Sequence, residues 1–184
     1  NEPLLDERLL DMIKYAKGKS QRLFLDITTN GKLLTVEMID ELFKFGLDNI
    51  NINDYRGDRD KHPNQWSSYI EPLFEAYGNN PKVYFKRRRL DEVLPNYAGN
   101  IPQSFSEEEF GFYPFRKLTI AYNGDVLLCC DDFMYDTKFG NILKDSIIDC
   151  WNNEQYNKIR ISLLENKRIS ICKRCNDFQD YNTF

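Results

Sequence analysis

Two pairs of cysteines in the last third of the chain constrain its fold more than any other feature. Four of the five cysteines are the adjacent Cys129 and Cys130 and the C-x-x-C pair of Cys172 and Cys175. Two thiolates three positions apart on a tight turn can bind one tetrahedral centre, so the C-x-x-C pair predicts a metal knuckle. The first pair follows an Asn-Gly turn at residues 123–124, between two apolar runs, which is the strongest short signal for a β-hairpin. We therefore expect a hairpin that carries a thiol to the knuckle.

The individual cysteines have different expected roles. Successive side chains of a strand point to opposite faces, so only one of Cys129 and Cys130 can easily face the knuckle. Cys150, which precedes Trp151 on an expected helix, is interpreted as a core residue. The sequence has five cysteines, an odd number, and two of them form a C-x-x-C. This indicates cytosolic thiolate ligands rather than a disulfide framework.

The composition, with 41% hydrophobic and 29% charged residues, is that of an ordinary globular protein. A length of 184 residues allows one large domain or two small ones. The net charge of −4 gives no electrostatic case for nucleic acid. No apolar run approaches the roughly 18 residues that span a bilayer, and there is no signal peptide. We expect a cytoplasmic location, with neither nucleic acid nor a membrane as partner.

The first half of the chain alternates between helical and extended patterns. Apolar residues at the helical period, with turn and capping residues between them, predict helices near residues 5–17, 35–45 and 65–77 and strands near 22–28, 49–53 and 82–86. Such alternation with short connections predicts a parallel sheet of βαβ units. Three strands are too few for a closed barrel, and the chain does not begin with Met. We therefore expect the start of the sheet to lie upstream of residue 1.

A second, smaller domain is expected after the pattern fades. Residues 90–110 are rich in Pro, Asn, Gly and Glu, so we place the domains at 1–108 and 109–184. The hairpin of residues 116–130 opens the second domain. Ser146 with Asp149 resembles a capping box and predicts a helix. One face of that helix would carry Ile148, Trp151, Ile159 and Leu163.

Several separated motifs in order resemble one family. They are Asn-Gly-Asp-Val-x-x-Cys-Cys-x-Asp at 123–132, Gly-Asn-Ile at 140–142, Ser-Ile-x-Asp-x-Trp-Asn at 146–152, Ile-Arg at 159–160 and the final C-x-x-C. This arrangement resembles the SPASM/twitch domain, the C-terminal extension of many radical S-adenosylmethionine (radical SAM) enzymes that carries auxiliary iron–sulfur clusters. The resemblance implies an α/β fold, with the C-terminal portion of a partial (β/α)6 radical SAM barrel followed by a small α+β domain of hairpin, helix and cysteine knuckle.

The resemblance also implies cofactor-binding residues in the first half. The Glu-Pro-Leu sequence that begins at Glu2 is similar to the end of the family's Gly-Gly-Glu-Pro-Leu segment, whose Glu lies near the amino group of S-adenosylmethionine. Asn53 and Asp54 are similar to the polar tip of a strand that approaches the same cofactor. Arg88 lies in a basic run after the last strand, where ligands of open α/β sheets bind, and could pair with a carboxylate. A solvated strand end and a solvated basic surface are the alternative interpretations of these residues.

The ligands of the auxiliary site follow from the family's spacing. The Gly-x4-Cys spacing from Gly124 selects Cys129, which with Cys172 and Cys175 gives three cysteine ligands. The family's first cysteine of this domain, about a dozen residues before the hairpin glycine, has no counterpart here. A single [4Fe–4S] cluster or a degenerate site is therefore expected, and zinc is the alternative occupant. The fourth ligand could be Cys130, an upstream cysteine, substrate or none.

A further departure concerns activity. The C-x-x-x-C-x-x-C loop that holds the S-adenosylmethionine-binding [4Fe–4S] cluster belongs upstream of Glu2 and is absent from this sequence. Without it this polypeptide should be inactive alone. The resemblance implies a parent enzyme that generates a 5′-deoxyadenosyl radical, takes electrons from an external donor and modifies a peptide, protein or sugar-type substrate. No catalytic residue is assigned. A non-catalytic binding module stabilised by zinc or an iron–sulfur cluster is the second hypothesis.

Overall fold

The structure is a computed structural model, and it describes residues 2–55, 65–88, 98 and 112–175. The chain divides into two compact units, residues 1–92 and 93–184. Each unit is described by itself below. The predicted boundary between residues 108 and 109 lies outside the described residues and stays a prediction.

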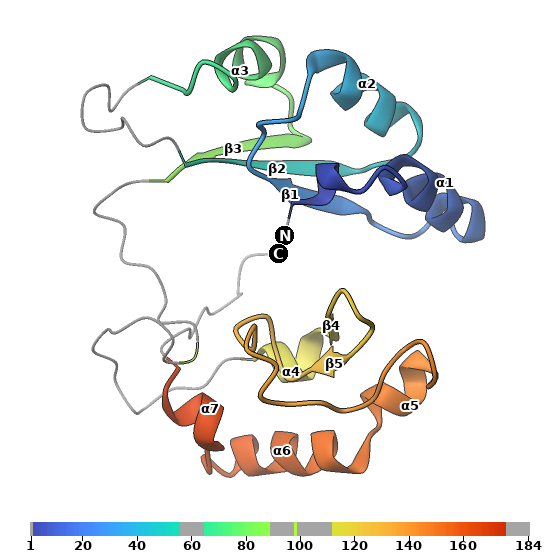
Figure 1. The fold of residues 1–184 in the computed structure, drawn as a ribbon, viewed down its shortest axis with the longest axis vertical. Helices are drawn as coiled ribbons and strands as arrows, with labels where there is room; N and C mark the ends of the chain where they lie inside the picture. Colours follow the sequence, from blue (N-terminus) through green and yellow to red (C-terminus); the bar gives the residue numbers. More distant parts are fainter. Residues whose placement is uncertain (1, 56–64, 89–97, 99–111, 176–184) are drawn as a thin grey trace. The chain divides into compact units, whose positions relative to one another are not determined.

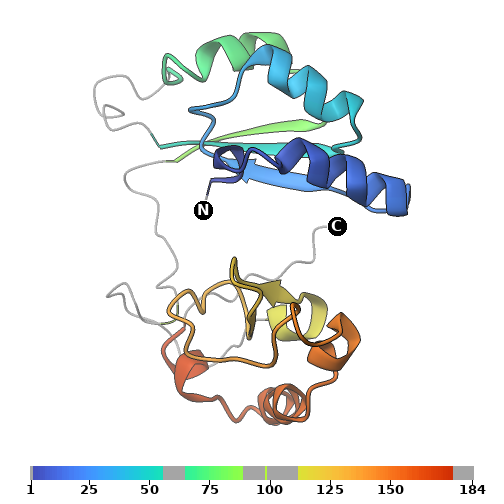
Figure 2. The ribbon, with the colours of Figure 1, turned by 45° about the vertical axis from the view of Figure 1, so that its right-hand side comes forward.

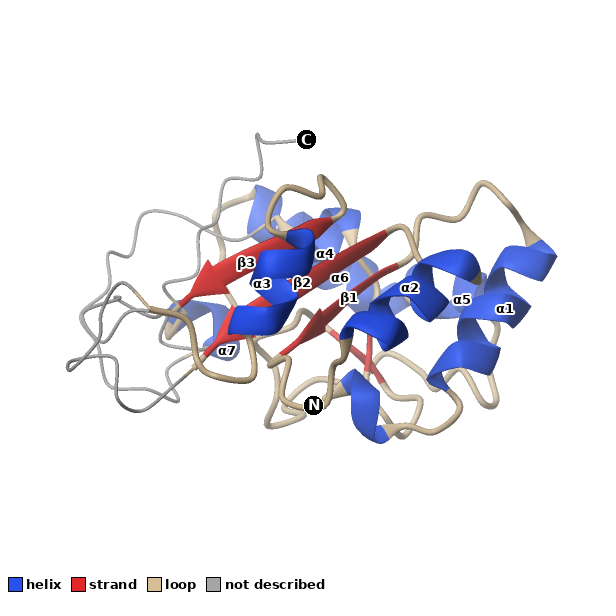
Figure 3. Cartoon of the chain, turned by 90° about the horizontal axis from the view of Figure 1, so that it is seen from above, coloured by secondary structure: helices blue, strands red, loops and turns tan. Residues whose placement is uncertain are grey.

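The first unit is a three-stranded parallel sheet with helices on one face. Strands β1 (Asp26–Thr29), β2 (Asn49–Asp54) and β3 (Val83–Arg87) lie in the order β1-β2-β3. Around them are the short 3-10 helix η1 (Pro3–Leu5) and helices α1 (Leu9–Lys19), α2 (Val36–Lys44) and α3 (Glu71–Tyr77). Figures 1 and 3 show α2 and α3 over the same side of the sheet. The parallel sheet of βαβ units and the mixed α/β class are thus confirmed.

The two faces of this sheet differ sharply in character. Ile27 pairs with Ile50, and Ile50 with Val83, on the face that joins the hydrophobic core with the helices. The opposite face carries polar side chains, because residues one position along each strand point the other way. Asn51 lies there and donates a hydrogen bond of 2.7 Å to Asp26. The Asn-Ile alternation of β2 therefore separates an apolar core face from a polar face.

Local chemistry explains where the helices begin and end. The Thr35 hydroxyl accepts a hydrogen bond from the Met38 amide at 3.2 Å, which caps α2 as expected. Pro72 lies in the first turn of α3, so the helix expected near residues 65–77 begins only at Glu71. The predicted strand over 22–28 is shorter than expected, because β1 starts at Asp26. Leu25, the residue before β1, instead bonds to the start of β2. Its amide donates to the Asp48 carboxylate, and its carbonyl accepts from the amides of Asp48 and Asn49.

The second unit contains a short hairpin followed by helices. Its elements are α4 (Tyr113–Arg116), β4 (Thr119–Ile120), β5 (Val126–Leu127), α5 (Ile147–Trp151), α6 (Glu154–Leu164) and α7 (Ser170–Lys173). Strands β4 and β5 pair antiparallel, and Gly124 in their turn has φ +86°, a left-handed conformation that glycine adopts readily. The expected hairpin exists, although its paired strands are much shorter than the predicted span of 116–130.

One expected helix proves to be two. Ser146 caps α5 as predicted, but that helix ends at Trp151, and Asn153 caps a new helix by accepting from the amides of Gln155 and Tyr156. The expectation of one apolar face is wrong, because Ile148 is 71% exposed whereas Leu163 is 1% exposed. Figures 1 and 2 show α5 and α6 as separate helices.

The described helices include none that is both long enough and apolar enough to cross a membrane.

Candidate cofactor and cluster sites

Cys129 follows β5 in a turn that several residues hold in place. The Asp132 amide donates to the Cys129 carbonyl at 3.2 Å, which closes the turn. The preceding residue, Leu128, is fully buried, and its carbonyl accepts a 3.1 Å hydrogen bond from the Tyr156 hydroxyl of α6. The Leu128 amide donates a hydrogen bond of 3.0 Å to the Thr137 hydroxyl oxygen. The backbone on the N-terminal side of the thiol is therefore fixed from both sides.

The final C-x-x-C pair lies on a single helical turn. Cys172 belongs to α7, and the Cys175 amide donates to the Cys172 carbonyl at 3.3 Å. Ile171, 3% exposed, anchors this turn in the core of the second unit, against which both cysteines also pack. Residues three apart on a helical turn lie on the same side, so both thiols can face one site. The tight turn predicted from the C-x-x-C spacing is present.

Burial and neighbouring negative charge both oppose ionisation of the thiols of Cys129 and Cys172. Burial raises the pKa of the Cys129 thiol above its ordinary range, and negative charge at Asp131 and Cys172 adds to the effect. Burial raises the pKa of Cys172 to about 11, with Cys175 as the next contribution. Burial keeps these thiols protonated, so they need a nearby cation to become thiolates. A bound metal supplies that positive charge.

A zinc ion and an iron–sulfur cluster require different spacings of their sulfur ligands. Among the described residues, no group of three or more His, Cys, Asp and Glu side chains converges closely enough to hold one metal ion. A tetrahedral zinc ion with bonds of about 2.3 Å would bring its sulfur ligands to within about 4 Å of one another. A cluster contains several iron atoms, each with its own protein ligand, so its cysteines stand further apart.

The two remaining cysteines differ from these three. Cys130 is exposed. Cys150 is 1% exposed and packs under Gly140, where a Cβ atom would approach its sulfur to 2.8 Å. Burial also raises the pKa of the Cys150 thiol. Its position supports the interpretation of Cys150 as a core residue.

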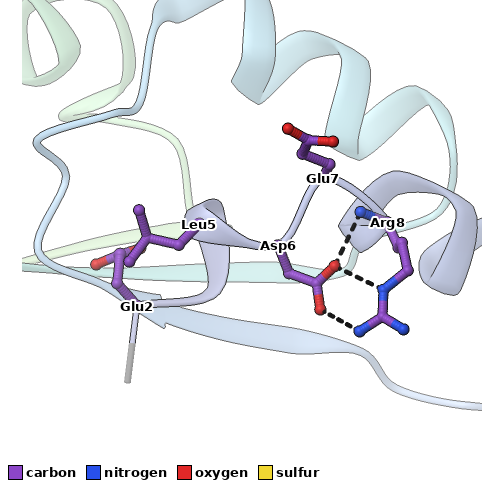
Figure 4. A pocket seen from close by; sticks show the side chains of 5 residues that line it. All are labelled: Glu2, Leu5, Asp6, Glu7 and Arg8. Atoms are coloured by element: carbon purple, nitrogen blue, oxygen red, sulfur yellow. Dashed lines mark hydrogen bonds and ion pairs between the residues drawn. The ribbon is translucent and has the colours of Figure 1, made fainter.

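Glu2 lies at the carboxyl end of β1. Its carboxylate accepts hydrogen bonds from the Thr29 hydroxyl at 2.7 Å, the Asn30 amide at 2.9 Å and the Leu4 amide at 3.2 Å. A cavity of about 420 Å³ adjoins it, lined by Glu2, Leu5, Asp6, Glu7 and Arg8 (Figure 4). The three protein donors fix the carboxylate at the sheet edge.

Asn53 and Asp54, at the end of β2, point to opposite faces. Asp54 is fully buried, and its carboxylate accepts from the Ser67 amide at 2.8 Å and the Ser67 hydroxyl at 2.5 Å. Asn53 is 6% exposed and lies on the polar face, beside Lys86 of β3. The geometry therefore favours Asn53 over Asp54 for contact with a ligand, although a cofactor role for either stays a prediction.

Arg88 directly follows β3. Its amide donates to the Asp54 carbonyl at 3.0 Å, and its guanidinium lies 5.7 Å from the centre of the Tyr55 ring. Because parallel strands end at one edge, Glu2, Asn53 and Arg88 all lie along the carboxyl edge of the sheet. The structure thus brings the expected cofactor residues to one edge, with Asp54 turned toward the helices.

Sequence reasoning missed several residues that support these sites. Thr29 and Ser67 hold the two carboxylates of the first unit, and Tyr156 holds the backbone beside Cys129. Asp132 accepts from the amides of Asp136 and Thr137 at 2.8 and 3.0 Å and so shapes the loop after the cysteines. The only signal in the sequence was the motif that contains Asp132, because the other partners are distant along the chain.

Comparison with known proteins finds a match to a family model within the second unit. Residues 112–176 match the SPASM family, described as an iron–sulfur cluster-binding domain. The match includes Cys129, Cys172 and Cys175.

Two further comparisons extend over nearly the whole chain. An S-adenosyl-L-methionine-dependent 2-deoxy-scyllo-inosamine dehydrogenase from Niallia circulans is 28% identical over 181 residues, which are 96% of this chain and 70% of that protein. The crystal structure of BtrN with AdoMet and 2-DOIA matches 100% of this chain and 73% of its own, with a TM-score of 0.83 and 24% identity. An open conformation of selenomethionine-labelled BtrN matches 96% of this chain and 67% of its own, with a TM-score of 0.70 and 23% identity. The structural matches show a shared fold.

Proposed function

Because this chain joins part of a radical SAM fold to a SPASM domain, we propose that it is the C-terminal part of an enzyme that oxidises a small, sugar-type substrate. The observation that carries the proposal is the coincidence of two findings. The SPASM match covers residues 112–176, which include Cys129, Cys172 and Cys175, and the similarity to an inosamine dehydrogenase extends over 96% of the chain. Of the expected substrate classes, this favours a hydroxylated ring over a peptide or protein.

The carboxyl edge of the sheet is the proposed position of S-adenosylmethionine. Glu2 is already held by three donors and would bind the ammonium group of the cofactor. Arg88 would form an ion pair with the carboxylate of the cofactor. The Asn53 amide would form hydrogen bonds with polar atoms of the cofactor. Asp54 would act indirectly, since its bonds to Ser67 hold the end of β2 in place.

The second unit would serve electron transfer. When bound, a [4Fe–4S] auxiliary cluster would supply an acceptor for the electron that remains on the substrate after hydrogen-atom abstraction. Loss of that electron and of one proton completes a two-electron oxidation of an alcohol to a ketone. The three cysteines would hold the cluster, and Tyr156 would hold the turn that carries Cys129.

Metal content tests the cluster assignment. We expect the 184-residue chain, after anaerobic reconstitution, to contain iron and acid-labile sulfide and to absorb visible light. Cys172→Ala should lose most of this iron, whereas Cys130→Ser, at an exposed position, should retain it. Equal iron in Cys172→Ala and the unchanged chain would contradict the ligand assignment. Colourless protein with stoichiometric zinc would instead support a non-catalytic module.

Activity is tested in the full-length protein that we expect to carry the C-x-x-x-C-x-x-C segment upstream. With S-adenosylmethionine, a reductant and 2-deoxy-scyllo-inosamine, we expect 5′-deoxyadenosine together with an oxidised product. Formation of 5′-deoxyadenosine with no oxidation of this or related aminocyclitols would refute the proposed substrate class. Glu2→Gln should weaken S-adenosylmethionine binding at least tenfold, which corresponds to about 1.4 kcal/mol.

A further inference from the structure

The polar face of the three-stranded sheet carries amide side chains that are nearly buried and lack partners. Strand β2 has Asn49, Asn51 and Asn53 at every second position, so all three point to the same side. Asn49 is 8% exposed and Asn53 is 6% exposed. Neither of these two side-chain amides forms a hydrogen bond with a residue that the structure describes. Because an amide that is shielded from water without a partner is unfavourable, these groups favour a polar ligand on this face.

Asp26, the first residue of β1, adds a negative charge to the same face. It pairs with Asn49 in the sheet register, and its carboxylate oxygen Oδ2 accepts a hydrogen bond of 2.7 Å from Nδ2 of Asn51. The side chain is exposed, and no Lys, Arg or His among the described residues forms an ion pair with it. A carboxylate accepts at about four lone-pair sites, of which this bond uses one. The Asp26 carboxylate can therefore accept further hydrogen bonds from a cationic ligand.

These groups lie between the amino ends of the strands and the proposed position of the cofactor. Asn51 precedes Asn53 on β2, and Asp26 opens the strand that ends at Thr29, the partner of Glu2. At about 3.3 Å per residue, these two steps along the strands correspond to about 7 and 10 Å. A ring held at the Asp26 carboxylate would therefore lie beside a cofactor that is bound at the carboxyl edge of the sheet.

The neighbours of Asn51 in the sheet register add an aromatic ring and a hydroxyl group. Tyr84 of β3 pairs with Asn51 on one side and is 59% exposed, and Thr28 of β1 pairs with it on the other side and is also exposed. An aromatic ring packs against apolar C–H groups, whereas hydroxyl and amide groups form hydrogen bonds. This combination suits a ring that has C–H groups on its faces and hydroxyl groups around its rim.

We propose that Asp26, oriented by its hydrogen bond from Asn51, binds the amino group of the substrate. This inference rests on the proposed function, because it assigns a partner to one substituent of the amino-substituted ring proposed there. A protonated amino group brings three N–H donors and a positive charge to the carboxylate, and such charge-assisted bonds are stronger than neutral ones. The Asn49 amide and the Thr28 hydroxyl would bind ring hydroxyls. Asp26 would thereby distinguish an amino-substituted ring from a neutral one.

The test measures binding of two rings to the full-length protein with S-adenosylmethionine and without a reductant, so that no turnover occurs. Calorimetric titration gives the dissociation constants of 2-deoxy-scyllo-inosamine and of scyllo-inositol, which has no amino group. The unchanged protein is compared with Asp26→Asn, which keeps the shape of the side chain and loses its charge, and with Asp26→Glu, which keeps the charge. Asp11→Asn is the matched control, since its side chain is 83% exposed on α1 and lies 3.8 Å from the Lys14 ammonium.

We expect the unchanged protein and Asp11→Asn to bind the amine more tightly than the neutral ring. Asp26→Asn should weaken binding of the amine at least about tenfold and change binding of the neutral ring less than about twofold. Asp26→Glu should still prefer the amine.

Equal weakening of both rings in Asp26→Asn would overturn the inference, because it would indicate that the Asp26–Asn51 bond only holds the two strands together. Equal affinity of the unchanged protein for the two rings would also overturn it. Binding of neither ring by the unchanged protein would instead refute the proposed substrate class, and this inference with it.

Discussion

At the scale of single residues, the side chains of one dipeptide have opposite environments. Asp54 is buried on the helix side of β2 and bonds to Ser67, while Asn53 lies on the polar face. The structure shows no hydrogen bond from the Asn53 side chain to another described residue. One residue therefore stabilises the fold, and the other remains available to a ligand.

Substitutions at these positions should separate stability from binding. Asp54→Ala removes the acceptor of two hydrogen bonds and leaves the Ser67 donors buried, so we expect a loss of about 1 to 3 kcal/mol in the free energy of unfolding. Asn53→Ala should cost less than about 1 kcal/mol. Denaturation with urea measures both values. A larger loss for Asn53→Ala than for Asp54→Ala would show that the two roles are reversed.

A second prediction at this scale concerns pH. The Lys17 ammonium and the Leu25 amide donate to one carboxylate oxygen of Asp48 at 2.6 and 2.8 Å, and these bonds lower the pKa of that carboxyl. The charged form is thus favoured in the folded state. Its contribution is fully present above the unfolded pKa of about 3.9 and is lost as the pH falls through the lower folded pKa.

We therefore expect stability to decrease below about pH 4 by an amount that Asp48→Asn abolishes. Thermal unfolding between about pH 2 and 6 measures the difference between the two proteins. An identical pH dependence in Asp48→Asn would show that other carboxyl groups cause the decrease.

At the scale of elements, the junction of α5 and α6 depends on one buried arginine. The Arg160 guanidinium lies 4.0 Å from the centre of the Trp151 ring and 3.8 Å from that of Tyr156. It donates to the carbonyls of Pro114 and Trp151 at 2.7 and 2.6 Å and to Asn157 at 2.7 Å. This side chain thereby connects α4, α5 and α6, and its ring neighbour Tyr156 supports the turn of Cys129.

Arg160→Lys should be destabilising although it conserves charge. A lysine ammonium cannot stack between two rings and reach three acceptors, so we expect a loss of about 2 kcal/mol. Lys158→Ala is the control on the same helix, since its pair with Glu154 is largely exposed and should be worth less than about 1 kcal/mol. Similar losses for both variants in denaturation experiments would contradict this assignment.

At the scale of the whole molecule, the described residues form two hydrophobic cores, one in each unit. One contains Ile39 and Ile50 of the first unit, and the other contains Val126 and Tyr156 beside the cysteines. A ligand stabilises the unit that binds it. Binding of a cluster should therefore affect the two cores unequally.

Removal of iron should loosen the second unit only. We expect a chelator to accelerate amide hydrogen exchange around Val126 and Tyr156 and to leave exchange around Ile39 and Ile50 unchanged. Exchange followed by mass spectrometry on peptides of the holo and apo chain measures this. Equal acceleration in both units would indicate that the cluster supports them together.

Periodicity and local chemistry determined much of the architecture. The order of helices and strands in the first half, the parallel sheet, the Thr35 and Ser146 caps and the Asn-Gly hairpin all followed from short-range signals, which depend on neighbouring residues alone. The match of residues 112–176 to the SPASM model was also expected from the order of the motifs. Local signals failed where two similar patterns adjoin, as at the break between α5 and α6.

The tertiary structure decided which side chains meet. Side-chain hydrogen bonds join Glu2 to Thr29, Asp54 to Ser67 and Asp131 to Cys175. The partners are 27, 13 and 44 residues apart in the sequence. No local signal specifies such pairs, because they depend on how strands are ordered and how loops return to the core. The sequence by itself identified the cysteines and the strand ends. Only the folded chain turned Asp54 away from the polar face and brought Asp131 to the thiols.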